Sequence, residues 1–425
     1  MKFFILLLLS VNFLSAKTVN PRELSELAQE RAPLVKIFLE QESMGQNQLK
    51  QSRVLANPIL TYQGGRLKSG TQSGQVTDLT FMQPVPWPGK RSALIKSHEF
   101  LSRISQMDVA EARLSLGHRV YILAYELASE IEIEKHNKER KERFSLIAKY
   151  LSSRPLASPK QQLDKDIIES QIRLVEKLMN QVTARKNGLR EELRLLTGLD
   201  SLDITVDWEK LPAPHPRDYY ASNIGDGWRI KKLDQSVKLS ENRIEEARLQ
   251  ARPDIMVGVN YRQENVAPVN HFYHGQVAVV IPIVDRGQHS VQTARAQLRR
   301  DEASMKLAVQ ETNTELASRA QLRRDEASMK LAVQETNTEL AYSYESLLAA
   351  KNGLSLFPMT LKHKSELRFQ KAEDAFRKGQ IDVMTFLQSD TQVHENIDLI
   401  YTSRLEYLTA VSRLEQLVGH YLEEK

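Results

Sequence analysis

The apolar residues of this chain follow two different periods. Between residues 58 and 83 apolar and polar residues alternate, as at Leu60 and Tyr62, and after Gly89 the apolar residues recur every three or four positions. Alternation is typical of a half-buried β-strand, and the longer spacing is typical of a helix. Residues 83–91 (QPVPWPGKR) separate the two patterns and contain three prolines, which cannot donate hydrogen bonds within a sheet. A sheet is therefore predicted to end here and a long helix to begin.

Four strands are predicted, in two pairs. The first pair covers residues of about 58–66 and 76–83, and the second covers about 253–263 and 274–283. In both pairs apolar residues alternate with small or polar ones, so each strand has two unlike faces.

Each pair of strands is followed by a long helical hairpin. The first hairpin turns at about residues 152–159 and ends at Gly198; the second turns at about 378–381 and ends at Gly419. The first helix of the first hairpin carries one continuous apolar stripe, formed by Val109, Ala112, Leu116, Val120, Leu123 and Leu127. A two-helix hairpin is too narrow to bury a globular core alone, so we expect it to pack sideways on other helices.

The order of helix, strand pair and helical hairpin occurs twice. Residues 17–198 and 228–419 are therefore predicted to be two structural repeats. Residues 199–227, which contain three closely spaced prolines, are predicted to be an irregular connector, and residues 420–425 a C-terminal tail. No Pro- or Gly-rich linker divides the chain into separate domains.

A short duplication is superimposed on the second repeat. Residues 295–317 reappear letter for letter at 319–341, an offset of 24. The second hairpin measures 132 residues between its two flanking glycines and the first measures 109, and 132 − 24 = 108. A helix of 24 residues is about 36 Å long, and no other helix has a matching addition. We expect the extra residues to be bulged or looped out; a recent duplication or a sequence-assembly error is the alternative origin.

Composition excludes several classes of protein. Residues 1–16 combine Lys2, an apolar run and a small-residue end, as in a secretory signal peptide. The absence of cysteine excludes disulfides, thiolate metal sites and lipid attachment to cysteine. The 59 basic and 54 acidic residues are interspersed, which is typical of the solvated faces of long helices and not of a nucleic-acid-binding patch.

A membrane-crossing part of this chain would have to be a sheet. After residue 16 no run of about 18 apolar residues occurs. Four open strands in a bilayer would leave backbone groups unsatisfied, so several copies would have to close one barrel, and three copies would give twelve strands. Trp87 lies where an aromatic girdle would meet the membrane surface; an ordinary packing role is the alternative.

The organisation resembles that of TolC-type outer-membrane efflux proteins over essentially the whole mature chain. The resemblance rests on the doubled element order and on local matches at Asn57, Pro58 and Leu60, the Pro-to-Gly junctions at 84–89 and 282–287, and the ends LLTG (195–198) and QLVG (416–419). The junction at residues 83–91 resembles the branch that serves heavy-metal cation efflux.

This resemblance implies a mainly α-helical protein with a small β part. It implies a homotrimer with a twelve-stranded β-barrel in the outer membrane, in contact with its lipid, and an α-helical tunnel in the periplasm. The implied partners are a periplasmic adaptor protein and an inner-membrane pump of the RND type, with no nucleic acid. The implied mechanism is passive conduction through a duct that is gated at its periplasmic tip, with no cofactor.

The resemblance also implies where the gate lies. Family members carry acidic residues six and nine positions after the glycine at the second tip, and counting from Gly379 these positions are Thr385 and Gln388. Both acids are therefore missing. Asp382 and Asp390 flank the positions, and a threefold ring of either would favour cations. The alternative is that both are ordinary exposed helix charges.

The two hairpin tips are the implied contacts with the adaptor. They contain Arg154, Pro155 and Leu156 in the first hairpin and Arg377, Gly379 and Ile381 in the second. The alternative is that proline and glycine only make the turns. His271 and His274 are expected in an extracellular loop, where a metal site without a third ligand is the alternative to ordinary loop residues. His289 and His394 are expected on solvated helix faces.

Several functions remain as alternatives or are excluded. The chain has no Gly-rich phosphate loop, no HExxH and no GxSxG, so it is not expected to be an enzyme. A secreted coiled-coil structural or adhesive protein would explain the helices without the strands. Among transporters, multidrug or solvent efflux and type I secretion remain open, because the pump selects the substrate.

Overall fold

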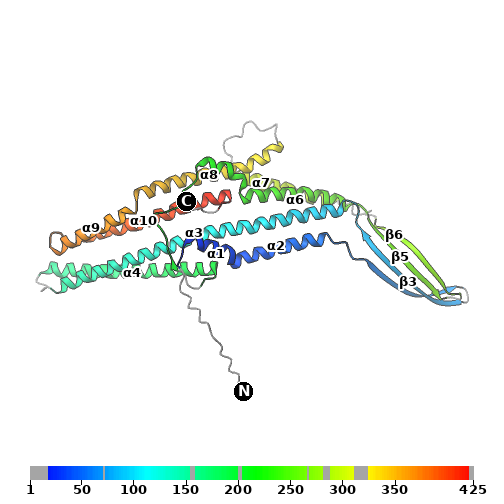
Figure 1. Cartoon of the computed structure of the whole chain (residues 1–425), viewed down its shortest axis with the longest axis horizontal. Helices are drawn as coiled ribbons and strands as arrows, with labels where there is room; N and C mark the ends of the chain where they lie inside the picture. The colour runs from blue at the N-terminus through cyan, green and yellow to red at the C-terminus, as the bar shows by residue number, and fades with distance from the viewer. Residues whose placement is uncertain are drawn as a thin grey trace, which may run out of the picture. The chain divides into compact units, whose positions relative to one another are not determined.

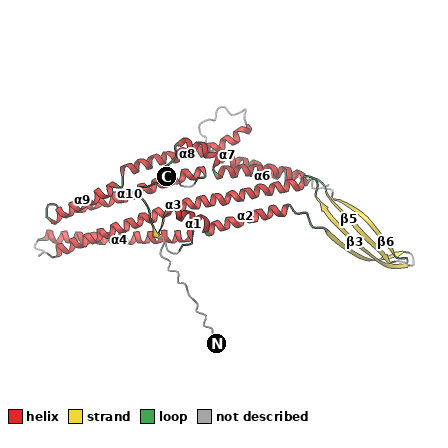
Figure 2. Ribbon diagram, viewed as in Figure 1, coloured by secondary structure: helices red, strands yellow, loops and turns green. Residues whose placement is uncertain are grey.

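The computed structural model describes residues 18–420, apart from 70–71, 154–157, 200–202, 266–267, 281–287 and 311–323. Within these limits the chain is mainly helical, with one antiparallel sheet of four strands and one short parallel pair (Figure 2). The predicted fold class is confirmed in these respects. None of the helices in the described part is long and apolar enough to span a membrane.

The chain divides into two compact units, each built from separate segments. The hairpin unit consists of Met1–Ile37, Glu111–Gly227 and Thr338–Lys425, and the sheet unit consists of Phe38–Ala110 and Trp228–Asn337. Along the sequence, boundaries between the units fall within α2 (Pro33–Ser52), α3 (Lys90–Ser152) and α8 (Arg324–Leu356), which are labelled in Figure 1.

The sheet unit contains the four-stranded antiparallel sheet. Its strands are β2 (Ile59–Ser69), β3 (Gln72–Val85), β5 (Asp254–Asn265) and β6 (Asn270–Val280), in the order β2-β3-β5-β6. The central pair joins the two sequence repeats, because β3 lies beside β5 with Phe81 opposite Val259. All four strands extend further towards the tip of their hairpin than the alternation of apolar residues predicts, since backbone pairing continues where side chains are small or polar.

Helices of the sheet unit are held together by polar contacts as well as by packing. They are most of α2, the first part of α3, α6 (Trp228–Gln250), α7 (Gln288–Gln310) and the first part of α8, and α6 packs against α7. The Asn242 amide on α6 donates to the Ala93 carbonyl and to Ser97 Oγ of α3, at 2.8 and 2.9 Å. Ser97 Oγ in turn donates to Glu246 Oε2 at 2.7 Å. These bonds fix the register of α6 on α3.

The hairpin unit contains the remaining helices. They are α1 (Pro21–Arg31), the rest of α3, α4 (Pro159–Thr197), α5 (Arg217–Asn223), the C-terminal part of α8, α9 (Thr360–Arg377) and α10 (Val383–Val418). The predicted stripe on α3 is buried, for example at Leu116, Val120 and Leu127. Two apolar clusters form the core, one around Tyr125 and Leu408 and the other containing Phe144, Ile168, Phe369, Phe386 and Ile397.

Helix ends in this unit follow from local sequence. Ser158 caps α4 by accepting a hydrogen bond from the Gln161 amide, with proline as the first helical residue. Gly198 and Gly419 end α4 and α10 with positive φ angles of 72° and 78°, which residues with a Cβ rarely adopt. The two matched sequence ends, LLTG and QLVG, are therefore both left-handed helix caps.

The connector between the repeats is more ordered than the sequence indicates. It contains β4 (Asp203–Ile204), α5 and a turn of 3₁₀ helix at Ile224–Asp226. Strand β4 pairs in parallel with β1 (Thr18–Val19), a pairing of residues far apart in the sequence. No local pattern signals such a two-residue pair, because only tertiary packing brings the segments together.

The predicted first helix of the second hairpin is interrupted before its tip. In the described part between residues 324 and 377 the chain forms α8 and then α9, and the break between them contains Pro358. Proline lacks the amide hydrogen and clashes with the preceding turn, which explains the break. The duplicated segment includes residues 311–323, outside the described part, so its expected bulge stays a prediction.

Candidate functional site

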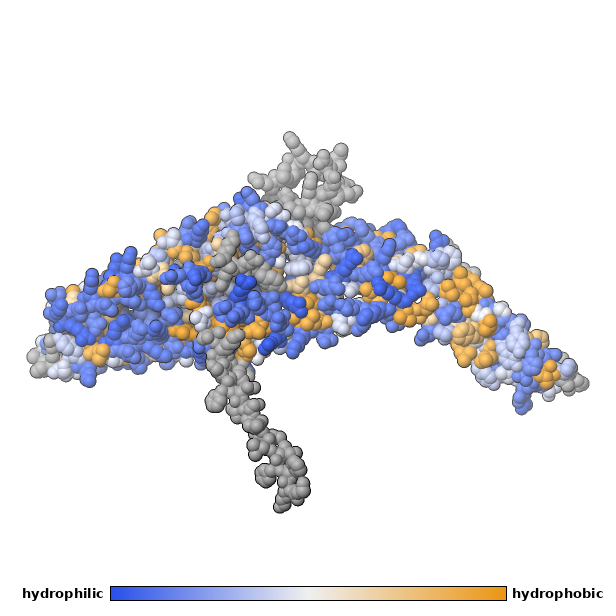
Figure 3. All heavy atoms as spheres, in the orientation of Figure 1, coloured by the Kyte–Doolittle hydropathy of each residue, from blue (hydrophilic) through white to orange (hydrophobic). Residues whose placement is uncertain are grey.

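One face of the sheet is mainly apolar, with Gln83 among its apolar residues and Thr77, Gln263 and His271 nearer the hairpin tips. The strand register places Leu60 beside Phe81 and Val259, and the residues of this face, which we call the apolar face, are Leu60, Tyr62, Leu79, Phe81, Val85, Ile255, Val257, Val259, Tyr261, Tyr273, Val277 and Val279. Several are well exposed, including Leu60 at 66% and Val277 at 70%. Figure 3 shows orange, apolar residues over these strands. An exposed apolar surface of this extent marks an interaction site.

The opposite face of the sheet is polar at its centre. Asn260 lies there, 8% exposed, and its amide donates to Thr80 Oγ1 at 2.8 Å. Arg262 and Glu264 form an ion pair at 2.8 Å on the same face. Exposed Ile59, Phe272 and Val280 also lie on this face, so it is mixed, whereas the first face is mainly apolar.

Both edges of this sheet are formed by long strands. In the described part of the chain β2 and β6 each pair on one side only, with β3 and β5 respectively. The backbone amides and carbonyls along their outer sides can hydrogen-bond to a strand of another chain. The sheet is therefore suited to continue into a neighbouring copy.

The junction between strand and helix lies within the sheet unit. Lys90 Nζ donates to the Arg252 carbonyl and to Asp254 Oδ1, each at 2.8 Å, and so joins the start of α3 to the start of β5. The preceding Gly89 has a φ angle of 94°, which the turn into α3 requires. Trp87 is half-buried, and its carbonyl accepts from the Lys90 amide at 3.1 Å.

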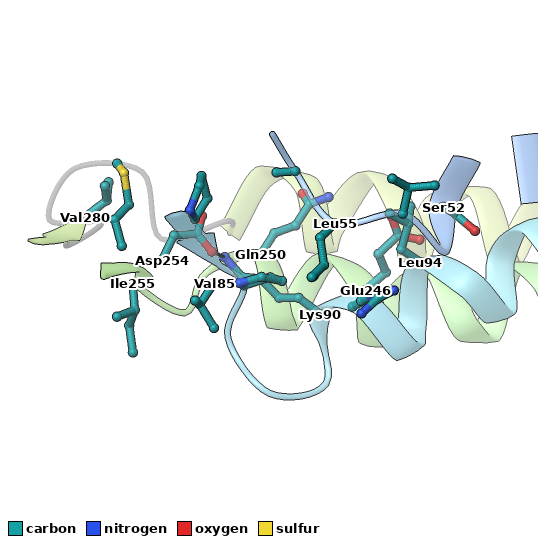
Figure 4. A pocket seen from close by; sticks show the side chains of 16 residues that line it. Ser52, Leu55, Val85, Lys90, Leu94, Glu246, Gln250, Asp254, Ile255 and Val280 are labelled. Carbon is teal, nitrogen blue, oxygen red and sulfur yellow. Dashed lines mark hydrogen bonds and ion pairs between the residues drawn. The ribbon is translucent and has the colours of Figure 1, made fainter. Parts of the chain in front are cut away.

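A cavity of about 570 Å³ opens beside this junction. Its wall is apolar at Leu55, Val85 and Ile255, with Lys90 and Glu246 among its charged residues (Figure 4). Lys90 and Arg91 are balanced in number by Glu246 and Asp254, and Lys90 is paired with Asp254, so the cavity presents no excess of positive charge.

The turn between α9 and α10 places the gate candidates. Gly379 reverses the chain with a φ angle of 71°, and its amide donates to the Phe376 carbonyl at 2.9 Å. Asp382 then caps α10, because its Oδ1 accepts from the Thr385 amide at 2.8 Å. This hydrogen bond lowers the pKa of Asp382, so the exposed carboxylate carries its charge throughout the neutral range. The sequence interpretation missed the capping role.

The four gate candidates do not lie alike. Asp382, Thr385 and Gln388 are exposed, whereas Asp390 is only 3% exposed. Arg140 on α3, itself 4% exposed, forms an ion pair with Asp390, with Arg140 Nε donating to Asp390 Oδ2 at 2.6 Å. Within the chain the charge of Asp390 is thus neutralised by Arg140. The sequence predicted Asp390 either in a charged ring of the pore or on an exposed helix face, and its burial corrects both expectations.

Helical periodicity explains the burial of Asp390. It continues the stripe of α10 that contains Val383, Phe386, Val393 and Ile397, all of them buried. A single carboxylate within such a stripe requires a buried cation opposite it. The position of Asp390 within the apolar stripe therefore indicated its burial in the sequence. The partner of Asp390, Arg140, lies 250 residues away and could not be identified from that pattern.

Two histidines lie near this ion pair. His136 on α3 stacks on His394 on α10 with ring centroids 5.5 Å apart, and His394 Nε2 lies 3.6 Å from Asp398 Oδ2. Burial, with the neighbouring His394 and the cations Arg143, Arg140 and Lys362, lowers the pKa of His136 from 6.5 to about 3. The expectation that His394 lies on a solvated face was wrong: its side chain is 17% exposed.

Acid is expected to destabilise the hairpin unit through His136. Because the folded pKa is about 3 and the unfolded pKa about 6.5, the unfolded chain binds the proton first, and stability falls as the pH drops from 6.5 towards 3. At pH 4.5 the loss from this residue is about 2–3 kcal/mol. Thermal unfolding of a His136→Asn variant between pH 7.5 and 4.5 should therefore depend less on pH than that of the unmodified protein. A His289→Asn variant, altered at an exposed position, should keep the full pH dependence; equal dependence in all three would contradict the assignment.

Of the adaptor-contact candidates, Arg154, Pro155 and Leu156 lie outside the described residues. In the second tip Gly379 is exposed and Ile381 packs partly against the cluster around Phe386. The guanidinium of Arg377 contacts Glu373 Oε1 at 2.6 and 3.1 Å, and its carbonyl accepts from Tyr150 Oη. Arg377 therefore stabilises the tip in addition to any contact with a partner.

His271 and His274 are not in a loop. Both belong to β6, where neighbouring residues alternate between the faces, so an offset of three places them on opposite faces. They cannot share a metal ion within the chain. Among the described residues no group of three or more metal-ligating side chains is assembled.

Comparison with known proteins gives a result at the level of structure. No family model matches the sequence, and no curated protein does either. Among solved structures, a membrane protein from Pseudomonas aeruginosa matches with a TM-score of 0.73, 13% identity, and coverage of 96% of this chain and 93% of that one. The open-state MtrE outer membrane channel of Neisseria gonorrhoeae matches with a TM-score of 0.70, 13% identity, and coverage of 96% and 90%.

A third match is CusC, whose structures concern folding and transmembrane channel formation, with a TM-score of 0.69, 12% identity, and coverage of 95% and 93%. The fold is that of TolC-type outer-membrane channels. The likeness extends over nearly the whole of each chain. The similarity of this chain to CusC and to MtrE is nearly equal and does not distinguish between them.

Proposed function

We propose that this protein is the outer-membrane exit channel of a tripartite efflux system. The observation that carries the proposal is the four-stranded sheet, which has one mainly apolar face, one face that is polar at its centre, and long strands at both edges. The fold of TolC-type channels supports it. The chain would conduct substrate passively and would use no cofactor.

In the proposed assembly three copies close one barrel. Strand β2 of each copy pairs with β6 of the next, which gives three times four, or twelve, strands and satisfies both sheet edges. The apolar face contacts outer-membrane lipid and the polar face lines water. Trp87, at the junction with α3, would lie near the periplasmic surface of the membrane, and the helices would form a tunnel in the periplasm.

Assembly and location can be tested together. The expressed protein should be found in the outer-membrane fraction and should migrate as a trimer that dissociates on heating. In planar bilayers it should conduct ions. Recovery as a soluble, secreted monomer would instead support the coiled-coil structural or adhesive alternative.

We further propose that Asp382, Thr385 and Gln388 line the periplasmic constriction, with Asp382 supplying a ring of three negative charges. The support is that all three are exposed near the turn after α9, whereas Asp390 is paired with Arg140. The adaptor would contact the same tip at Arg377, Gly379 and Ile381, together with Arg154, Pro155 and Leu156 of the other tip.

Replacing Asp382 with asparagine should reduce cation selectivity without weakening the helix cap. Asparagine caps helices as well as aspartate does, so the variant removes the charge alone. The cation-to-anion permeability ratio, measured from reversal potentials in a salt gradient, should fall by roughly twofold or more. Asp374→Asn, an exposed acid on α9 before the turn, is the matched control and should leave the ratio unchanged. An unchanged ratio in Asp382→Asn would reject the charge ring.

The proposed substrates are heavy-metal cations delivered by an RND pump. Support comes from the junction QPVPWPGKR and from the acidic position at the proposed constriction. A deletion strain should become sensitive to one or more of zinc, cobalt, cadmium, copper and silver, while its tolerance of drugs and solvents stays unchanged. Drug or solvent sensitivity without metal sensitivity would favour a multidrug channel, and loss of a secreted protein would favour type I secretion.

A further inference from the structure

The duplicated segment has a consequence for packing on α6. The first copy (295–317) and the second copy (319–341) are identical, so both have the same intrinsic preference for any surface that one of them contacts. The first copy supplies most of α7, which packs against α6 in the sheet unit. Helix α8 includes most of the second copy, which is therefore also helical where described.

The contact of the first copy with α6 is specific. Ser240 on α6 is fully buried, with 0% exposure, and its hydroxyl donates to Asp301 Oδ2. Asp301 Oδ1 also accepts from Gln297 at 3.2 Å and from Arg300 at 2.9 Å. The Asp301 side chain is 14% exposed. A buried hydroxyl that loses its carboxylate partner costs free energy, so this face of α6 favours a helix that presents an aspartate at this position.

The second copy offers the same groups in the same order. Asp325 is the counterpart of Asp301, and Arg324 is the counterpart of Arg300. Any 24 consecutive residues between 295 and 341 can be left out of the packed helix without changing what remains. In each case the remaining residues spell the 23-residue repeat once, in the same order. The contacts with α6 are therefore equivalent in every such register, and the registers differ only in where the helix is interrupted.

We infer that the face of α6 around Ser240 binds either copy, in two registers that are 24 residues apart. In one register Asp301 contacts Ser240, and in the other Asp325 does. The packing of the sheet unit is kept in both, and the surplus residues follow the docked helix in the first register and precede it in the second. This inference does not depend on the proposed channel function.

Cross-linking in the full-length protein tests the inference directly, because the chain has no natural cysteine. Ser240→Cys is combined with Asp301→Cys in one variant and with Asp325→Cys in another, and each is treated with a short bismaleimide. Both variants should yield an internally cross-linked product, identified by mass spectrometry after proteolysis. Because the two registers make the same contacts, their populations should be similar, and the two yields should agree within about threefold.

Matched controls use the adjacent helix face. Ala303 is exposed and lies two positions after Asp301, so Ser240→Cys with Ala303→Cys, or with Ala327→Cys in the second copy, should give little product. A product with Asp301→Cys and none with Asp325→Cys would overturn the inference.

A second measurement avoids changing Ser240. Asp301→Ala and Asp325→Ala, made singly, should each leave the midpoint of thermal unfolding nearly unchanged, because the other copy still supplies a carboxylate. The double variant should lower the midpoint by a few degrees. An Asp301→Ala variant that loses as much as the double variant would show that only the first copy docks.

Discussion

Replacing Arg140 with alanine is expected to lower the stability of the hairpin unit by about 3–5 kcal/mol. Asp390 is 3% exposed, and Arg140 is its ion-pair partner in the described structure. The variant would leave a carboxylate buried without a counter-charge, which costs far more than the loss of an exposed pair. Thermal unfolding followed by helical circular dichroism should show a large fall in the midpoint.

The double variant Arg140→Met with Asp390→Leu removes both charges, whereas Arg140→Ala removes only the counter-charge of Asp390, so comparing them isolates the cost of an unpaired buried carboxylate. It fills the same space with apolar groups and should recover most of the stability, since no charge then remains buried. Arg22→Ala removes an exposed pair with Glu26 and should cost no more than about 1 kcal/mol. A loss in Arg140→Ala no larger than in Arg22→Ala would contradict the buried pair.

Replacing Gly258 with alanine is expected to disrupt the pairing of β3 with β5. A Cβ at this position would overlap the Phe81 carbonyl oxygen and the Met82 sulfur, and would lie 3.0 Å from Met82 Cα. The carbonyl belongs to the backbone and cannot turn away, so the strands must separate locally. Overpacking of this kind costs about 1–3 kcal/mol or more. The yield of the proposed heat-dissociable trimer should fall severely.

Gly275 provides the matched control on the neighbouring strand β6. A Cβ added there would have nothing within 4 Å, and its φ angle is in the ordinary range. Gly275→Ala should therefore assemble normally. Normal assembly of Gly258→Ala, with the same heat stability as Gly275→Ala, would show that the close approach of β5 to β3 is not as described.

Local patterns predicted a large part of the fold. The alternation around Leu60 and Val259 identified strands, and the stripe through Leu116 and Leu127 identified the long helix α3. These elements are encoded by side chains a few residues apart, which share a face because of the strand and helix periods. Pro358 was a local signal as well, and it was missed because the helical spacing continues on both sides of it.

The candidate site was less predictable. Asp390, which the sequence interpretation placed in contact with solvent, is buried against Arg140, and His394 stacks on His136. Each pair joins α3 to α10 across more than 200 residues of sequence. Asp382 was correctly found at the turn, but its cap on α10 depends on backbone geometry that a count of positions from Gly379 does not contain.

By itself, the sequence determined the doubled order of helix, strand pair and hairpin, the Pro-to-Gly junction at residues 83–91, and the 24-residue duplication. All three follow from periodicity, from the chemistry of proline and glycine, and from identity of letters, which need no knowledge of distant neighbours. Only the tertiary structure decided that β3 pairs with β5, that Asp390 is neutralised and that Ser240 holds Asp301. Burial and partnership are properties of residues brought together from distant segments, so no single segment specifies them.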